Sequence, residues 1–292
     1  MPTITTSDGT KLHTEDTGSG DPIVFVHEYA GDHRSWEPQV RFLSRRYRCI
    51  TYAARGYAPS DVPEDVDKYS QARVVDDIRD VMDGLGIETA HIVGLSMGGF
   101  ATLHFGLNHP DRARSLVAAG AGVGSDPDYH DRFRREARDV ATMIETKGMA
   151  AFAEVYSSAA ARQTLREKDP RGFEEFFRML AEHSATGSAN TMRGYQAERP
   201  SLYDFEEQFA ALNVPVLLIV GDEDDHCLRP GLFLKSTIPA CGLAVLPKTG
   251  HTVNLEEPAA FNALVADFLA QVEHGRWTKR DMATAGDVMR TT

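Results

Sequence analysis

The chain has 292 residues, which suits one large domain with an insertion and leaves room for a sizeable buried core. Its 43 Asp and Glu residues outnumber its 31 Lys and Arg residues, and the formal net charge of -12 would repel a nucleic-acid backbone or an anionic membrane surface. We therefore expect neither nucleic acid nor a membrane as a partner.

The amino-terminal sequence and the cysteines give no sign of secretion. The stretch MPTITTSDGTKL lacks the basic and apolar parts of a signal peptide, and no stretch approaches the roughly 18 apolar residues that span a membrane. Cys49, Cys227 and Cys241 show no C-x-x-C spacing, which supports neither a disulfide framework nor a zinc site. We expect a cytoplasmic protein.

Short apolar runs rich in β-forming residues recur along the chain and alternate with helical patterns. After a polar segment before residue 20 that predicts an edge hairpin, these runs predict buried strands at 23–26, 49–52, 91–95, 116–119, 216–220 and 243–246. Helical periodicity is clearest at residues 74–85 and 261–272. The alternation is typical of an α/β fold with a doubly wound, mostly parallel sheet of the eight-stranded type and helices on both faces.

The sequence VHEYAGDH follows the first buried strand and invites two interpretations. A zinc-protease helix needs two histidines four residues apart, but Gly31 lies four residues after His27, and His33 lies six residues after it. At about 100° per residue, the two imidazoles would point roughly 120° apart. We therefore predict a loop that ends a strand, and no metal site.

The sequence GLSMGG at residues 94–99 matches the G-x-S-x-G nucleophile elbow, a sharp strand-to-helix turn that exposes a serine oxygen. The apolar run HIV precedes it, and FATLHFGLNHP follows as a helix that ends at Pro110. This context predicts Ser96 as an exposed nucleophile.

The alternation of strands and helices stops at about residue 126 and resumes near residue 203. The intervening stretch is helical in pattern, rich in charge and free of strand signals. We predict a helical cap at residues 125–205, inserted into an α/β core of residues 1–124 and 206–274, with a tail at residues 275–292.

Four segments together resemble the α/β-hydrolase family. They are HEYAG at residues 27–31, ARGYAPSD at 54–61, GLSMGG at 94–99 and TGHTVNLEEP at 249–258, and the resemblance covers roughly residues 10–272. The chain is similar in particular to capped esterases, lactonases, cofactor-free haloperoxidases and carbon-carbon bond hydrolases. The resemblance implies a small-molecule substrate and no cofactor, and it leaves open a homodimer.

The resemblance also implies a catalytic triad in the chain order serine, acid, histidine. Ser96 is the expected nucleophile, and His251 in TGHTVNLEEP matches the family's catalytic histidine. The acid should lie on the loop after the PVLLIVG strand, where the family's G-x-x-D pattern selects Asp224, with Asp225 as the fallback.

An oxyanion hole needs two fixed N–H donors. By family position we expect the backbone N–H groups of Met97 and Tyr29 to supply them, while His27 ties down the loop that carries Tyr29.

Glu28 departs from the family pattern, because most relatives have glycine there. A carboxylate so close to a developing oxyanion would oppose it. Glu28 therefore either turns away to meet a cation such as Arg34 or Arg55, in which case Glu28→Gly should leave the fold and ester cleavage largely intact, or it acts in the site by orienting a water or a substrate amine. Ala53 also departs, since relatives often carry aspartate before R-G, and this puts the packing of that loop in doubt.

These residues predict a carboxylic ester hydrolase that cleaves an ester or lactone of a small to medium apolar substrate through an acyl-enzyme. A carbon-carbon bond (diketone) hydrolase, an amide-type hydrolase and a slowly turning-over ligand receptor stay open as alternatives. Apolar cap residues are expected to shape the substrate pocket or to hold the cap helices together, namely Phe133, Met143, Met149, Phe152, Tyr156, Phe173, Phe176, Phe177, Met179 and Tyr195.

Overall fold

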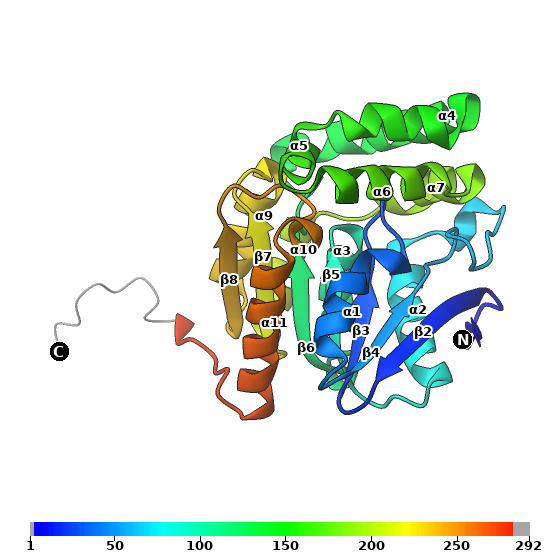
Figure 1. Ribbon diagram of the computed structural model, residues 1–292. Coiled ribbons are helices and arrows are strands. Elements are labelled where there is room, and N and C mark those ends of the chain that lie inside the picture. The colour runs from blue at the N-terminus through cyan, green and yellow to red at the C-terminus, as the bar shows by residue number, and fades with distance from the viewer. Residues whose placement is uncertain (1–2, 283–292) are drawn as a thin grey trace.

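The structure, a computed structural model, describes residues 3–282 (Figure 1). Within this range the chain forms an eight-stranded sheet in the order β1-β2-β4-β3-β5-β6-β7-β8. The strands are β1 (Thr3–Thr5), β2 (Lys11–Gly18), β3 (Pro22–Val26), β4 (Arg48–Tyr52), β5 (Ala90–Leu95), β6 (Ala113–Ala119), β7 (Val216–Gly221) and β8 (Cys241–Leu246). The predicted fold class is confirmed.

Antiparallel pairing is confined to one edge of the sheet. Strand β1 pairs antiparallel with β2, and β2 pairs antiparallel with β4, whereas every pair from β4 to β8 is parallel. The predicted edge hairpin is the β1–β2 pair. Its alternating burial contrasts with β5 and β7, where each residue is buried because helices cover both faces of the sheet.

Alternate residues of each central strand face two separate apolar layers. In β3, Ile23 and Phe25 pack into a cluster with α1 (Glu37–Leu43) and α11 (Pro258–Glu273). Val24 and Val26 face the opposite cluster, which includes side chains of α2 (Gln71–Gly84), α3 (Met97–Asn108) and α9 (Asp225–Thr237). The period of two along a strand thus places helices on both faces.

The chain between β6 and β7 forms helices that lie over one end of the sheet (Figure 1). They are α4 (Pro127–Ser157), α5 (Ala160–Lys168), α6 (Pro170–Ala181), α7 (Ala185–Asn190) and the π-helix η4 (Thr191–Gln196). Helix α4 bends at Gly148, whose φ of 81° and ψ of 170° are not helical. These helices occupy the predicted cap, but the division into cap, core and tail stays a prediction.

The remaining helical turns are short connections. They are η1 (His33–Trp36), η2 (Val66–Lys68), η3 (Pro110–Arg112), η5 (Leu202–Phe205), α8 (Glu206–Ala211) and α10 (Val253–Glu256). Of the predicted tail, residues 283–292 lie outside the described residues, while Trp277 packs on Phe268 of α11 and donates a hydrogen bond to the Ala240 carbonyl. No helix between residues 3 and 282 combines the length and the apolar character that crossing a membrane requires.

Candidate active site

Ser96 lies on a sharp turn between β5 and α3. Its backbone has a φ of 54°, a left-handed conformation that non-glycine residues rarely adopt. The turn is held by a hydrogen bond from Ser96 N–H to Ala119 O of 2.8 Å and requires close backbone approach on both sides. A Cβ at Gly94 would lie 2.2 Å from the Gly98 oxygen, and one at Gly98 would lie 2.0 Å from the Val26 oxygen, so both positions need glycine.

His251 lies on the loop between β8 and α10. Its backbone N–H donates to Ala161 O of α5 at 3.0 Å, so the helical segment above the sheet helps to hold this loop. The buried carboxylate of Glu256 accepts hydrogen bonds from the backbone N–H groups of Gly250 and Thr252 at 2.7 and 2.9 Å. No sequence motif marks Glu256, because it lies four residues after Thr252 and a capping box needs a spacing of three.

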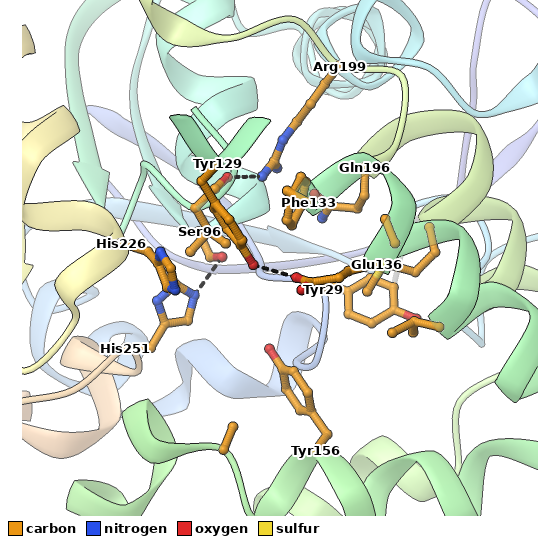
Figure 2. Close-up of a pocket in the computed structure, with 15 residues that line it drawn as sticks. Tyr29, Ser96, Tyr129, Phe133, Glu136, Tyr156, Gln196, Arg199, His226 and His251 are labelled. Atoms are coloured by element: carbon orange, nitrogen blue, oxygen red, sulfur yellow. Dashed lines mark hydrogen bonds between the residues drawn. The ribbon is translucent and has the colours of Figure 1, made fainter. Parts of the chain in front are cut away.

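The structure brings Ser96, His251 and Asp224 into one hydrogen-bonded chain. His251 Nε2 lies 2.7 Å from Ser96 Oγ (Figure 2), and His251 Nδ1 lies 2.7 Å from Asp224 Oδ2. An ionised Asp224 only accepts hydrogen bonds, so Nδ1 carries the proton and Nε2 is free to accept from the serine hydroxyl. Asp225, the fallback, is exposed at the start of α9.

Asp224 is buried, and its surroundings keep it ionised. Burial raises the pKa of its carboxyl group, but the charge of His251 and the hydrogen bond between them outweigh this effect and lower the pKa below its usual value. Cys227 lies beside the pair with its thiol directed to the Gly120 carbonyl at 3.2 Å, and burial raises the pKa of this thiol well above its ordinary value. The thiol is therefore protonated at neutral pH.

His27 ties together two loops beside Ser96. Its Nε2 accepts a hydrogen bond from Ala54 N–H at 3.0 Å, and its Nδ1 donates to Glu28 O at 2.7 Å. Burial lowers the pKa of His27 to about 4, so the ring is neutral and its tautomer is fixed by these two partners. The neighbouring residue Tyr29 is held by Tyr57, whose hydroxyl donates to the Tyr29 carbonyl at 2.9 Å.

The two expected N–H donors belong to residues near Ser96, since Met97 directly follows it and Tyr29 lines the same cavity. Met97 is the first residue of α3, where backbone N–H groups have no partner within the helix. Among the hydrogen bonds of residues 3–282, none uses the backbone N–H of Tyr29 or of Met97. Both groups are thus available to an acceptor, and the positive end of the α3 dipole favours a negatively charged one.

Glu28 is buried and forms a two-pronged ion pair with Arg162 of α5. The two bonds, Nη1 to Oε1 and Nη2 to Oε2, measure 3.1 and 2.5 Å. Burial raises the pKa of Glu28, but Arg162 lowers it by charge and hydrogen bonding, and the net shift is downward. The prediction that Glu28 meets a cation such as Arg34 or Arg55 was therefore wrong about the partner, which is Arg162.

Arg34 pairs instead with Asp32, and Arg55 pairs with Asp77 and Asp8. The true partner of Glu28 stands 134 positions away in the chain, which no local pattern could indicate. The other departure from the family pattern, Ala53, is fully buried, and its carbonyl accepts a hydrogen bond from Ser60 Oγ at 2.6 Å.

A cavity of about 390 Å³ opens beside Ser96 and His251 (Figure 2). Of the apolar cap residues singled out from the sequence, Phe133 and Tyr156 line it, together with Val123, Ala137, Val140 and Met192. Most of the others are buried in helix packing, which was the second role expected for them, among them Phe173, Phe176 and Phe177 of α6.

Polar groups from three segments also reach the cavity. No sequence motif includes Tyr129, Glu136, Gln196 or Arg199, and only the folded helices bring them to the wall of this cavity. The Tyr129 hydroxyl donates to Glu136 at 2.6 Å, and in Figure 2 Arg199 and His251 approach the cavity from opposite sides.

Two groups of side chains within residues 3–282 bring three metal-type ligand atoms close together. One is Asp224, Cys227 and His251, and the other is His13, Glu15 and His33 on β2 and η1. In the first group, two members already bond to each other and the thiol is protonated. That arrangement fits a hydrogen-bonded relay better than a metal site, because a metal needs the thiolate.

Known proteins that resemble this chain in sequence and structure agree with the fold described above. The family model described as alpha/beta hydrolase fold matches residues 21–258. The 3-oxoadipate enol-lactonase 1 of Acinetobacter baylyi is 27% identical over 92% of this chain and 97% of its own. The 2-hydroxy-6-oxo-6-phenylhexa-2,4-dienoate hydrolase of Burkholderia cepacia is 26% identical over 89% of this chain and 91% of its own. A thermophilic esterase from Thermogutta terrifontis has a similar solved structure, with a TM-score of 0.81 and 28% identity over 93% of this chain and 98% of its own.

Proposed function

Because this chain belongs to the α/β-hydrolase fold family, we propose that it is a serine hydrolase that cleaves a carboxylic ester or lactone of a small to medium apolar substrate. The observation that carries the proposal is the chain of two 2.7 Å hydrogen bonds from Ser96 through His251 to Asp224, at the wall of a largely apolar cavity. Relatives named as a lactonase and an esterase support the same reaction class.

In the first half-reaction, Ser96 Oγ attacks the substrate carbonyl carbon while His251 Nε2 takes the serine proton. Asp224 stabilises the imidazolium and keeps Nδ1 protonated. The carbonyl oxygen becomes an oxyanion that accepts hydrogen bonds from the N–H groups of Tyr29 and Met97, and losing one such donor typically costs about 3 kcal/mol. The C–O bond then breaks, the leaving alkoxide takes the proton from His251, and the acyl group stays on Ser96.

In the second half-reaction, His251 removes a proton from water, and the resulting hydroxide attacks the acyl carbon. The same two N–H groups stabilise the oxyanion, and Ser96 leaves with the proton returned by His251. The products are the free acid and the alcohol, or one hydroxy acid when the substrate is a lactone. No step needs an ion or a cofactor.

Labelling and turnover together test the proposal. A fluorophosphonate should modify wild-type protein at a ratio of about one per chain at Ser96, and Ser96→Ala should abolish both labelling and the hydrolysis of 4-nitrophenyl esters and lactones. Ser236→Ala, a change on the exposed face of α9, is the matched control and should behave as wild type. Absence of labelling in the wild type would favour a slowly turning-over receptor and contradict the proposal.

Carbon-carbon bond hydrolysis is the second candidate. It is favoured by the relative named as a phenylhexadienoate hydrolase, which matches most of this chain. The same serine, histidine and N–H donors would serve, so geometry does not separate the two reactions. Loss of the absorbance of such a dienoate, at a rate above that for the 4-nitrophenyl esters and lactones, would select this candidate.

A further inference from the structure

Three arginine side chains within residues 3–282 are buried, and one of them differs from the others in its partners. Arg55 is paired with Asp77, and Arg162 is paired with Glu28, in both cases through hydrogen bonds to a buried carboxylate. Arg199 is only 5% exposed, yet no ion pair of the described residues includes it. A buried cation normally needs an anion, because burial removes it from water.

The contacts of Arg199 satisfy its charge only in part. Nη2 donates to the Val123 carbonyl at 2.5 Å, and Cζ lies 3.7 Å from the centre of the Phe100 ring and 5.0 Å from that of Phe133. Burial lowers the pKa of Arg199 to about 10, which still leaves the guanidinium protonated at neutral pH. Contacts with ring faces offset part of the cost of burying the charge but supply no negative charge.

A second polar group in the same cavity wall also lacks a partner. Gln196, the last residue of η4, lies three residues before Arg199, is 5% exposed, and has an Oε1 atom that is buried without a hydrogen bond. Its terminal amide can present either its oxygen or its NH₂ group to a bound molecule by a half-turn. Both side chains line the cavity that contains Ser96 and His251 (Figure 2).

We propose that Arg199, assisted by Gln196, binds a free carboxylate carried by the substrate whose ester or lactone bond Ser96 attacks. The inference rests on the proposed hydrolase function and adds the substrate class, an acidic ester or lactone. A guanidinium binds a carboxylate through two parallel N–H bonds, and Arg199 has donors left after Nη2 binds Val123. A single negative charge fits better than a dianion, because the Glu136 carboxylate lies in the same wall.

The test compares substrates of equal length with and without the charge. Mono-4-nitrophenyl esters of adipate, pimelate and suberate carry a terminal carboxylate, and 4-nitrophenyl hexanoate, heptanoate and octanoate are their neutral counterparts. A second pair, 4-carboxyphenyl butyrate and phenyl butyrate, places the charge on the alcohol side. In at least one pair, we expect wild-type kcat/KM to be about tenfold or more higher for the charged ester, chiefly through a lower KM.

Variants assign this preference to the guanidinium. Arg199→Met should remove the preference by lowering kcat/KM for the charged ester about tenfold or more beyond its effect on the neutral ester, whereas Arg199→Lys should keep part of the preference. Arg138→Met, on the same cap but 43% exposed and paired with Glu198, is the matched control and should keep all of it. The inference is overturned if the wild type prefers no charged ester, or if Arg199→Met lowers kcat/KM equally for the charged and the neutral ester.

A binding measurement separates this inference from the proposed function. Calorimetry of Ser96→Ala protein with adipate monomethyl ester should show binding that weakens about tenfold or more in the Ser96→Ala/Arg199→Met protein. If no ester is hydrolysed and Ser96 is not labelled, the hydrolase proposal fails and this titration alone decides the carboxylate site. Equal binding by the two proteins, or none by either, would contradict the site.

Discussion

At the scale of single residues, Asp224 fixes which ring nitrogen of His251 carries the proton. The carboxylate accepts from Nδ1 at 2.7 Å, which leaves Nε2 facing Ser96 as the base of the proposed mechanism. An amide in place of the carboxylate can donate to Nδ1 and so favour the wrong tautomer.

Asp224→Asn should therefore lower kcat by about 10³- to 10⁴-fold on an aryl ester, with little change in fold as judged by circular dichroism. Asp225→Asn, which alters the exposed neighbour, is the matched control and should stay within about threefold of wild type. If the two variants lost activity equally, the assignment of Asp224 as the acid would be wrong.

The pair of Glu28 and Arg162 links the loop after β3 to the helices above the sheet. Because both side chains are at most 2% exposed, removing one partner leaves a buried charge without compensation. The buried pair argues against the expectation that Glu28→Gly leaves the fold intact, because the loss of Glu28 would leave Arg162 buried without an anion.

We predict that Glu28→Gln lowers the free energy of unfolding by about 3–5 kcal/mol in urea titrations. The double variant Glu28→Gln/Arg162→Met should recover part of this loss, because it removes the stranded cation as well. A loss below about 1 kcal/mol in the single variant would show that water or another group solvates Arg162.

At the scale of elements, helix α4 changes direction at a residue that only glycine accommodates easily. Gly148 combines a φ of 81° with a ψ of 170°, a conformation that costs other residues about 1–3 kcal/mol, although no neighbouring atom lies within 4 Å of a Cβ built there. A side chain at position 148 would thus be strained by its backbone conformation and not by contacts with neighbouring atoms.

Gly148→Ala should destabilise the protein by about 1–3 kcal/mol in urea unfolding. Lys147→Ala, at the exposed preceding position, should change the stability by less than about 0.5 kcal/mol. An unchanged midpoint in Gly148→Ala would mean that α4 straightens through this point at little cost.

The core elements could be predicted from sequence, whereas the geometry of the inserted helices could not. Strands such as β3 and β7 are continuous apolar runs, and α2 and α11 show clear helical periodicity, so local patterns carry the signal. The bend in α4 at Gly148 and the π-turn of η4 interrupt regular α-helix at points that the helical pattern of the sequence does not mark. The serine, histidine and acid candidates followed motifs, but Arg162 and Arg199 belong to none, and only packing brings them to the site.

At the scale of the whole molecule, the excess of acidic residues coexists with carboxylates held ionised by specific partners. The pKa of Glu28, Asp32 and Asp224 is below its ordinary value in each case, because cationic or hydrogen-bonding partners outweigh the effect of burial. A group whose folded pKa lies below its unfolded pKa stabilises the fold above the unfolded value, and this contribution is lost as the pH falls.

The urea midpoint should therefore begin to fall below about pH 6.5, where the unfolded chain protonates buried histidines such as His27, His91 and His104, whose pKa in the fold is about 4. It should fall more steeply below about pH 4, where the unfolded chain also protonates these carboxylates. The double variant Glu28→Gln/Arg162→Met should show a shallower fall, because one such carboxylate is gone. A midpoint independent of pH down to about 3 would contradict the role of these groups.

The hydrogen bond from His251 N–H to the Ala161 carbonyl has a consequence for protein engineering. Because the next residue along α5 is Arg162, one helical turn holds the loop of His251 and also supplies the cation that pairs with Glu28. A chimaera that exchanges this insertion for that of another hydrolase would lose both supports together. An exchange that keeps an arginine at position 162 and a glutamate at position 28 should give a folded protein. An exchange that changes only one of these two residues should give a poorly folded protein.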